Sequence, residues 1–286
     1  MANTNIYKED WTVKLQETLH APTVWRDVCR VDISSKRVLH NPYPTKAASV
    51  TGTRGTAYTF ADFTNTDDSV TISTKKLIAE FIDQADLGQT GYNLQMERAA
   101  MQGEEINLTI EEAFVGDHAN MTDFDNADLG GAAGSITLTN SNVDEVVTAI
   151  SQKIAAANGQ KQLARNGGFI IWDPGTFQKV QLFMMANGFA SADQMIRNGV
   201  DSGFEAMGFT HYRSNSLLTA SSVLHVIAGV KNQFHIGIYN GTWGKVKVND
   251  QDPGLQSGVG IISRVDFGVK VWNNVSTILY DVNIAE

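Results

Sequence analysis

The side chains best suited to bind a metal ion are six histidines, which are spread along the whole chain. They are His20, His40, His118, His211, His225 and His235. No two of them stand in an HxxxH or HExxH spacing, so the zinc motif that one face of a helix presents is absent. His225 and His235 fall in strand-like segments, where a core or edge position is the more common role. We therefore predict no metal ligand among them.

Cys29 is the single cysteine, so neither an intramolecular disulfide nor a CxxC metal site can form. The neighbouring Arg30 would favour a thiolate, but no partner histidine is identifiable. We expect Cys29 to be a small buried hydrophobe and not a nucleophile.

Acidic residues occur in two arrangements that could do chemistry. The segment from Asp123 to Gly130 is rich in Asp and Asn, but Ala127 and Asp128 occupy the fifth and sixth positions, where a calcium-binding EF-hand needs an oxygen ligand and a glycine. We expect a solvated loop there. The pairs Glu104–Glu105 and Glu111–Glu112 lie on a predicted long helix, and we expect them on an outward face, solvated or between subunits, and not in acid–base catalysis.

Nucleotide and hydrolase motifs are also missing. The sequence has no GxSxG elbow, no GxxxxGK[ST] loop and no GxGxxG after a strand, and the glycines at 254, 258 and 260 lie among turn residues. We predict no catalytic residue, no cofactor-binding residue, no metal ligand and no cofactor, and hence no enzyme. A soluble enzyme or binding module stays an alternative, and it would require a concave site with convergent titratable groups.

Composition narrows the classes further. The 286 residues carry 22 basic and 31 acidic side chains, a net charge of -9, which opposes tight binding to a phosphate backbone. No run of about 18 apolar residues occurs, and the amino terminus lacks the apolar run of a signal peptide, so we predict no membrane partner. Charged residues make up only 19% of the chain, which suits large permanent protein contacts.

The first third of the sequence predicts little core of its own. Residues 1–40 show no sustained periodicity apart from a possible short helix at 10–19, and we interpret them as an arm. Residues 41–69 are dense in Thr, Ser, Gly and Asn. From Val70 to Asp83 apolar and polar residues alternate, which predicts one strand about 43 Å long at ~3.3 Å per residue. We therefore interpret 41–83 as a protruding hairpin.

The rest of the chain predicts an α+β fold with a helical middle and a sheet-rich end. A helix over 90–115 would be about 39 Å long at 1.5 Å per residue. A short strand at 136–139 precedes a second helix at 141–158, and after a buried strand at 169–172 Asp173-Pro174 opens a third helix. Further strands are predicted in the sequences SVLHVIAGV, FHIGIYN, GKVKV, GVGIISRVDFGVKVW and STILYDVNI.

The order of these elements resembles the major capsid (coat) protein of tailed bacteriophages, with the fold named after the Hong Kong ninety-seven phage. The resemblance spans nearly the whole chain and depends on the order and spacing of its pieces. These are the alternating VTISTKKLIAEFIDQAD, the helix GYNLQMERAAMQGEEINLTIEEAF, the unit GFIIWDPGTFQKVQLF, the turn region NGVDSGFEAMGFTHYRSNSL and the late strand DFGVKVW.

The resemblance implies a set of domains. Residues 1–40 would be the N-arm, 41–83 the extended loop, 84–135 and about 236–262 the peripheral domain with a spine helix at 90–115. Residues 136–235 and about 263–286 would form the axial domain.

The resemblance also implies a function and partners. Copies of the chain would form pentamers and hexamers of an icosahedral phage head around double-stranded DNA, in which the extended loop lies over a neighbouring subunit. The virion would be its location and the host cytoplasm its place of assembly. Other expected partners are a scaffolding protein, a portal and possibly a decoration protein. The acidic chain is expected to contain the DNA without reading its sequence.

Two departures and one alternative accompany the resemblance. Some members carry a removable scaffolding segment of roughly a hundred residues, but here the arm begins within a few residues of Met1, so we expect a separate scaffold or none. Some members crosslink a loop lysine to a neighbour's asparagine; Lys46, Lys75 and Lys76 are the loop lysines here, but no partner asparagine can be assigned. An encapsulin-like shell around cargo enzymes is the alternative within the same fold.

Overall fold

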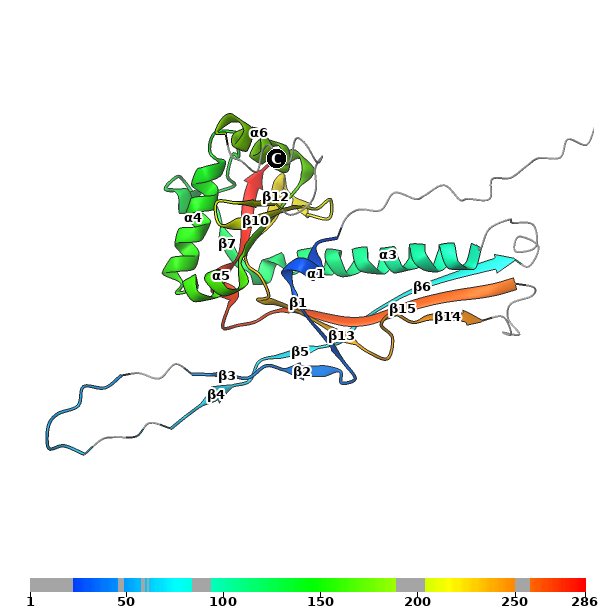
Figure 1. The fold of residues 1–286 in the computed structure, drawn as a ribbon, viewed down its shortest axis with the longest axis horizontal. Helices are drawn as coiled ribbons and strands as arrows, with labels where there is room; N and C mark the ends of the chain where they lie inside the picture. The colour runs from blue at the N-terminus through cyan, green and yellow to red at the C-terminus, as the bar shows by residue number, and fades with distance from the viewer. Residues whose placement is uncertain are drawn as a thin grey trace, which may run out of the picture.

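A computed structural model of the chain describes residues 23–45, 49–57, 60, 62–83, 94–188, 204–249 and 258–286. The molecule is elongated and has three parts (Figure 1). A long helix lies along a sheet, which together we call the slab. A compact lobe carries most of the other helices, and a hairpin, residues 38–71, projects away from both.

The slab contains a five-stranded sheet built around one long strand. Its strands are β1 (Arg30–Ser34), β13 (Phe234–Tyr239), β15 (Gly258–Val271), β14 (Val246–Asn249) and β6 (Thr74–Asp83). β15 pairs antiparallel with β6, β13 and β14, whereas β1 pairs parallel with β13. Helix α3 (Leu94–Gly116) packs on this sheet through Ile106, Ile110 and Phe114, which recur at helical spacing and are buried.

The compact lobe is a seven-stranded sheet flanked by helices. The strands are β7 (Thr122–Phe124), β16 (Leu279–Ala285), β12 (Val223–Val230), β8 (Gly168–Trp172), β10 (Phe209–Arg213), β9 (Phe204–Ala206) and β11 (Thr219–Ala220). The helices are α4 (Val143–Ala156), α5 (Gln160–Asn166) and α6 (Pro174–Ala186). Short 3-10 turns are η1 (His118–Asn120), η2 (Asn126–Leu129) and η3 (Ser276–Ile278).

Several elements of the lobe match their predictions because local sequence determines them. The predicted apolar face of the second helix is fully buried on α4, namely Val143, Val146, Val147, Ile150 and Ile154. The predicted buried strand is β8, and Pro174 occupies the first turn of α6. The carboxylate of Asp173 caps this helix by accepting a hydrogen bond from the Gly175 N–H at 2.8 Å. The predicted strand at 136–139 is only a single bridge from Ile136 to Ile284, and α5 was not predicted.

The hairpin consists of two short antiparallel ladders. β2 (Val38–His40) pairs with β5 (Ser69–Thr71), and β3 (Tyr43–Pro44) pairs with β4 (Asn65–Thr66). The single strand predicted from Val70 to Asp83 is therefore wrong: it is two strands, β5 in the hairpin and β6 in the slab. An alternating pattern identifies a strand with one buried face, but it does not show which sheet the strand joins.

Within the predicted arm at 1–40, residues 23–34 are packed against the slab. Helix α1 (Trp25–Val28) buries Trp25 and Val28, and β1 follows it into the slab sheet. Parallel pairing with β13, some two hundred residues away in the sequence, leaves no local period that would reveal it. The predicted helix at 10–19 and the start of the predicted spine helix, 90–93, lie outside the described residues.

Candidate assembly surfaces

The tip of the hairpin presents apolar side chains to solvent. In the described part of the hairpin, the cross-strand hydrogen bond farthest from the slab is the one that the Thr45 N–H donates to the Thr64 carbonyl at 3.0 Å. Beyond that point the side chains of Val50, Phe60 and Phe63 are 85%, 93% and 78% exposed. Large apolar side chains on a projecting segment indicate a surface that a partner covers.

The base of the hairpin, in contrast, is fitted closely to the slab. Gly237 on β13 and Gly268 on β15 are paired in register, so two positions without a side chain lie next to each other. A Cβ on Gly268 would collide with the backbone carbonyl of Thr71, and a Cβ on Gly237 would lie 2.8 Å from the Leu39 side chain. The paired glycines therefore allow the hairpin to cross the sheet in backbone contact.

Charged groups hold the same crossing in place. The buried Asp68 carboxylate accepts a hydrogen bond from the Lys270 ammonium at 2.5 Å and another from the Asn273 N–H at 2.8 Å. The Lys270 ammonium also donates to the Ser69 carbonyl at 2.9 Å. Gly268 and Lys270 are two residues apart in the late sequence DFGVKVW. Both contact the base of the hairpin.

A second ion-pair group lies beside the crossing. Arg264 donates to both oxygens of Asp266, at 2.7 and 2.6 Å, and Arg37 donates to one of them at 3.2 Å. The hydrogen bonds from Arg264, followed by its charge and by Arg37, hold the pKa of Asp266 below its ordinary value. Arg37 links the hairpin side of the crossing to β15.

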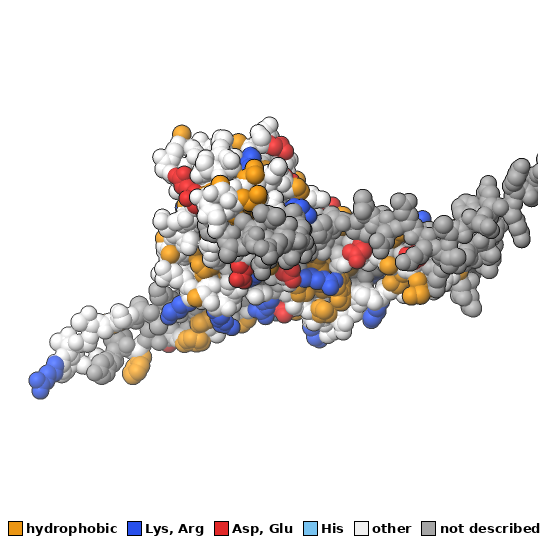
Figure 2. All heavy atoms as spheres, turned by 45° about the horizontal axis from the view of Figure 1, so that its top comes forward, with side chains coloured by type: hydrophobic (Ala, Val, Ile, Leu, Met, Phe, Trp, Pro, Cys, Tyr) orange, Lys and Arg blue, Asp and Glu red, His pale blue; other side chains and the backbone are white. Residues whose placement is uncertain are grey.

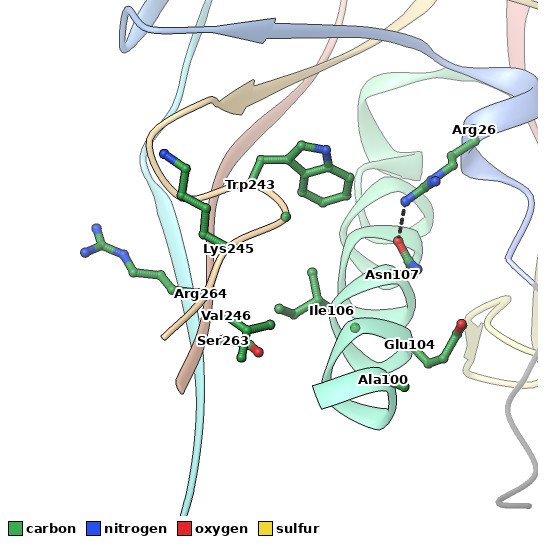
Figure 3. Close-up of a pocket in the computed structure, with 12 residues that line it drawn as sticks. Arg26, Ala100, Glu104, Ile106, Asn107, Trp243, Lys245, Val246, Ser263 and Arg264 are labelled. Atoms are coloured by element: carbon green, nitrogen blue, oxygen red, sulfur yellow. Dashed lines mark hydrogen bonds between the residues drawn. The ribbon is translucent and has the colours of Figure 1, made fainter. Parts of the chain in front are cut away.

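The slab carries a groove of about 300 Å³ between α3 and the β14–β15 edge (Figure 3). Its apolar lining comes from Ile106, Trp243 and Val246. At one end the Arg26 guanidinium lies over the Trp243 ring, 5.5 Å from its centroid, and donates to the Asn107 side chain at 2.9 Å. This groove, called the slab groove below, offers space for apolar side chains beside a fixed cation.

Further apolar side chains lie exposed on the strands of the slab. Leu77 and Phe81 on β6 are about half exposed, as are Val246 and Val248 on β14. Figure 2 shows apolar patches along the slab, between basic and acidic side chains. Together with the hairpin tip, these patches make the slab the best candidate for contacts between copies of the chain.

Glu111 is not on the outward face that the sequence predicted. It is fully buried, and its carboxylate accepts hydrogen bonds from the N–H groups of Val24 and Trp25 at 3.0 and 2.8 Å and from the Ser214 hydroxyl at 2.9 Å. Burial raises its pKa, although these three hydrogen bonds oppose the shift. Glu111 thus fastens the start of α1 and the loop after β10 to the middle of the molecule. Its neighbour Glu112 is exposed, as predicted.

The structure also places the cysteine, the acidic segment and the loop lysines that the sequence singled out. Cys29 is buried as predicted, and burial, followed by the nearby charge of Glu111, raises the pKa of its thiol well above its usual range. The segment 123–130 is not an open solvated loop: Asp125 and Asp128 form a capping box on η2, and Asp128 is paired with Lys153. Lys75 and Lys76 are exposed on β6, and Lys46 lies outside the described residues.

The described histidines are in the core, at the surface or in one cluster, and His20 lies outside the described residues. His211 is buried, accepts a hydrogen bond from the Trp172 indole N–H at 3.0 Å, and has its pKa lowered by burial to about 4. His235 is also buried, as predicted for a core position, and stacks on Trp272 with ring centroids 4.8 Å apart. His40 pairs with Asp67 at the surface. His118 and His225 meet at Asp281, which no sequence spacing suggested.

Comparison with known proteins finds similarity in structure and not in sequence. No family model and no curated protein matches the sequence. A chain from Mycobacterium phage Che8 matches with a TM-score of 0.73 at 15% identity, covering 98% of this chain and 97% of that one. The capsid of an empty GTA particle matches with a TM-score of 0.71 at 12% identity, covering 99% and 97%.

A third match is the capsid of Ralstonia phage GP4, with a TM-score of 0.70 at 9% identity, covering 99% of this chain and 96% of that one. Since these matches run over nearly the full length of both chains, the protein has the fold of phage capsid proteins, the Hong Kong ninety-seven fold. Among the described helices, none combines the length and the apolarity needed to cross a bilayer.

Proposed function

We propose that this chain is the major capsid protein of a tailed phage, a structural protein that forms pentamers and hexamers of an icosahedral shell around double-stranded DNA. The full-length structural match to phage and GTA capsids is the observation that carries the proposal. The encapsulin-like alternative is not favoured by these matches. In this proposal the slab is the peripheral domain, the compact lobe the axial domain and the hairpin the extended loop. These bounds differ from the predicted ones: residues 263–271 of β15 and 74–83 of β6 belong to the slab, and β7 (Thr122–Phe124) belongs to the lobe.

The contact between copies follows from the exposed surfaces. The hairpin of one copy lies over the slab of the next, where its tip side chains Val50, Phe60 and Phe63 meet the slab groove and the exposed apolar residues of β6 and β14. The hairpin and the slab are different surfaces of the same chain, and such a heterologous contact closes into rings when the rotation allows it. Contacts of this kind in permanent assemblies bury more than about 2,000 Å².

The remaining partners follow from the same role. A separate scaffolding protein and a portal would direct assembly in the host cytoplasm, and a decoration protein would bind the outside of the virion. The chain carries a net charge of -9, so DNA would be held by confinement with its counterions and not by base contacts.

Size-exclusion chromatography and negative-stain microscopy of the expressed full-length protein test the proposal. Rings or closed shells are the expected result, with or without a co-expressed scaffold. A chain that stays a monomer at high concentration under both conditions would contradict the proposal.

A further inference from the structure

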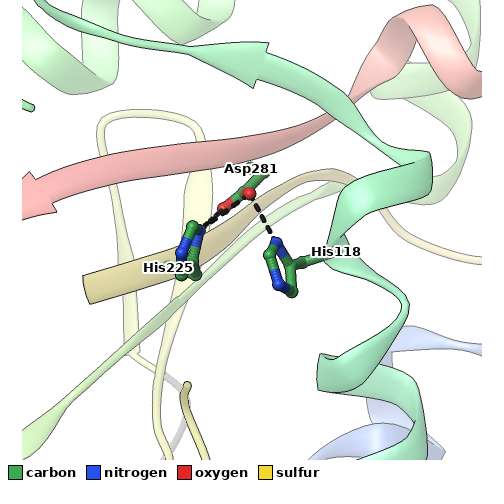
Figure 4. Close-up of side chains that lie close together, drawn as sticks. All are labelled: His118, His225 and Asp281. Carbon is green, nitrogen blue, oxygen red and sulfur yellow. Dashed lines mark hydrogen bonds and ion pairs between the residues drawn. The ribbon is translucent and has the colours of Figure 1, made fainter. Parts of the chain in front are cut away.

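Three side chains from separate parts of the sequence meet at the junction between the slab and the lobe (Figure 4). The Nδ1 atom of His118 lies 2.7 Å from the Asp281 carboxylate, and the Nδ1 atom of His225 lies 2.9 and 3.1 Å from its two oxygens. The two imidazole rings face each other with centroids 4.1 Å apart. One ligand atom from each residue lies within 4.8 Å of the other two.

The fold fixes the position of each of these side chains. His118 is in η1, two residues after the end of α3, so it comes from the end of the slab helix. His225 and Asp281 are on the neighbouring antiparallel strands β12 and β16 of the lobe. In that ladder His225 is opposite Asn283, which places Asp281 diagonally from His225 on the same face. The cluster therefore rests on two rigid strands and one helix end.

The charges of the cluster are not balanced by a basic residue. The Asp281 side chain is mostly buried, and its ion-pair partners among the described residues are the two histidines, with no Lys or Arg. Asp123 is in register with Asp281 on β7 and adds a second carboxylate. The side-chain amide of Asn283 donates to the Asp123 carboxylate at 2.6 Å, and the buried Oδ1 atom of Asn283 has no hydrogen-bond partner. A mostly buried carboxylate between two imidazoles, with no Lys or Arg paired to it among the described residues, favours a bound positive ion.

We propose that His118, His225 and Asp281 bind one divalent transition-metal ion of the zinc class. Two imidazole nitrogens and one carboxylate oxygen are a ligand set typical of Zn²⁺, and calcium or magnesium would prefer oxygen ligands alone. Zinc–ligand distances of about 2.0–2.1 Å in a tetrahedron separate the ligand atoms by about 3.3 Å. The nitrogen–oxygen distances of 2.7–3.1 Å are somewhat shorter than this, and all three ligand atoms lie within 4.8 Å of one another, so small side-chain movements would form the tetrahedron.

In the metal-bound form each Nδ1 atom gives its lone pair to the ion, and the single proton of each neutral imidazole is on Nε2. A water molecule would complete the four ligands. The ion would join the end of α3 to strands β12 and β16, and so fix the slab relative to the lobe. This inference concerns a single chain and does not depend on the proposed capsid role.

Zinc titration of the chelator-treated, full-length protein by isothermal calorimetry tests the site. We expect one Zn²⁺ per chain in the wild type, with no competition from excess Mg²⁺. Because loss of even an outer-shell partner weakens metal sites 10–100-fold, His225→Gln and Asp281→Asn should each lower the affinity by at least about 100-fold. His40→Gln is the matched control, since it removes a histidine paired with an aspartate on the surface, and it should bind as the wild type does.

Two outcomes would overturn the site: a wild-type chain that takes up no Zn²⁺, or variants that bind it unchanged. If the variants fail to fold, the wild type alone decides the question. Its Co²⁺ complex should show the intense visible absorption of a four-coordinate site, and anomalous diffraction at the zinc edge should place the ion between the three side chains. An ion found elsewhere, or a Co²⁺ spectrum typical of six oxygen ligands, counts against the proposal.

Discussion

The compact lobe and the projecting hairpin show two ways in which one chain stabilises its backbone. In the lobe every residue of β8 is buried, and α4 and α6 close over the sheet with apolar faces of helical period. In the hairpin two short ladders support a tip whose phenylalanines are almost fully exposed. The lobe completes its core within the chain, whereas the hairpin packs on the slab at its base and exposes large apolar side chains at its tip. The hairpin leaves the closely packed part of the molecule at Gly237 and Gly268, where its base crosses the slab sheet.

The largest effect on stability should come from the lobe. Trp172→Ala removes a fully buried ring from β8 together with its hydrogen bond to His211. Such a cavity should lower the free energy of unfolding by about 4 kcal/mol, measured by urea denaturation of the unassembled chain. Gln178→Ala on the exposed side of α6 is the control and should change it by less than about 0.5 kcal/mol. Equal effects of the two substitutions would mean that the lobe is not the stable core.

Glu111→Ala should have the next largest effect, because it leaves two backbone N–H groups and the Ser214 hydroxyl buried without an acceptor. We expect a loss of about 3 kcal/mol in urea denaturation. Glu112→Ala, one residue along the same helix and exposed, should cost less than about 0.5 kcal/mol. A similar loss in both variants would show that the buried carboxylate does not set the effect, since alanine itself favours a helix.

Gly268→Ala tests the crossing itself. The added Cβ meets the carbonyl of Thr71, which is backbone and cannot turn away as a side chain can. Overpacking of this kind should cost about 2 kcal/mol and should increase proteolysis within the hairpin. Gly103→Ala on α3 has open space around its Cβ and should stabilise the helix by up to about 1 kcal/mol. Unchanged proteolysis of the Gly268 variant would show that the hairpin base does not depend on this contact.

These residues also show how far the sequence alone could lead. Period and capping predicted α3, α4, α6 and β8, since a buried helical face and an Asp-Pro start are local signals. The sequence DFGVKVW includes Gly268 and Lys270, but the role of these two residues depends on Asp68 and Thr71, about two hundred residues earlier. The same limit applies to Glu111, which looked solvated beside Glu112 until Val24 and Trp25 are placed against it.

The histidine cluster illustrates this limit most clearly. The sequence predicted no metal ligand because its test was the spacing of ligands on one helix. His118, His225 and Asp281 come from a helix end and two strands, and only the pairing of β12 with β16 brings them together. Sequence spacing reveals a cluster when one element supplies its residues, and it does not when the sheet topology brings them together.

A smaller effect is expected when Glu111→Gln is compared with the wild type across pH. The folded-state pKa of Glu111 is raised, so its stabilising contribution is present below the unfolded value near 4.5 and is lost as the pH rises through the folded value. Glutamine does not titrate, and the nearby Cys29 thiol stays neutral in this range. The variant should therefore gain stability relative to the wild type with increasing pH. A constant difference, measured by denaturation between pH 4 and pH 8, would contradict the burial of the charge.

The smallest effect on the single chain should come from the hairpin tip, and it would sharpen the contrast with the lobe most. Phe60→Ser combined with Phe63→Ser changes side chains that are exposed in the monomer, so unfolding should shift by less than about 0.5 kcal/mol. In the proposed assembly the same side chains are buried against the next slab, so rings and shells should be lost in size-exclusion chromatography and negative-stain images.

The matched double variant Phe60→Leu and Phe63→Leu keeps the tip apolar and should still assemble. Loss of assembly in the serine variant, together with its retention in the leucine variant, would mean that apolar burial between copies, and not the fold of the hairpin itself, is what the tip contributes. Normal assembly of the serine variant would mean that the hairpin base and the slab alone hold the copies together, and that the exposed phenylalanines face a different partner.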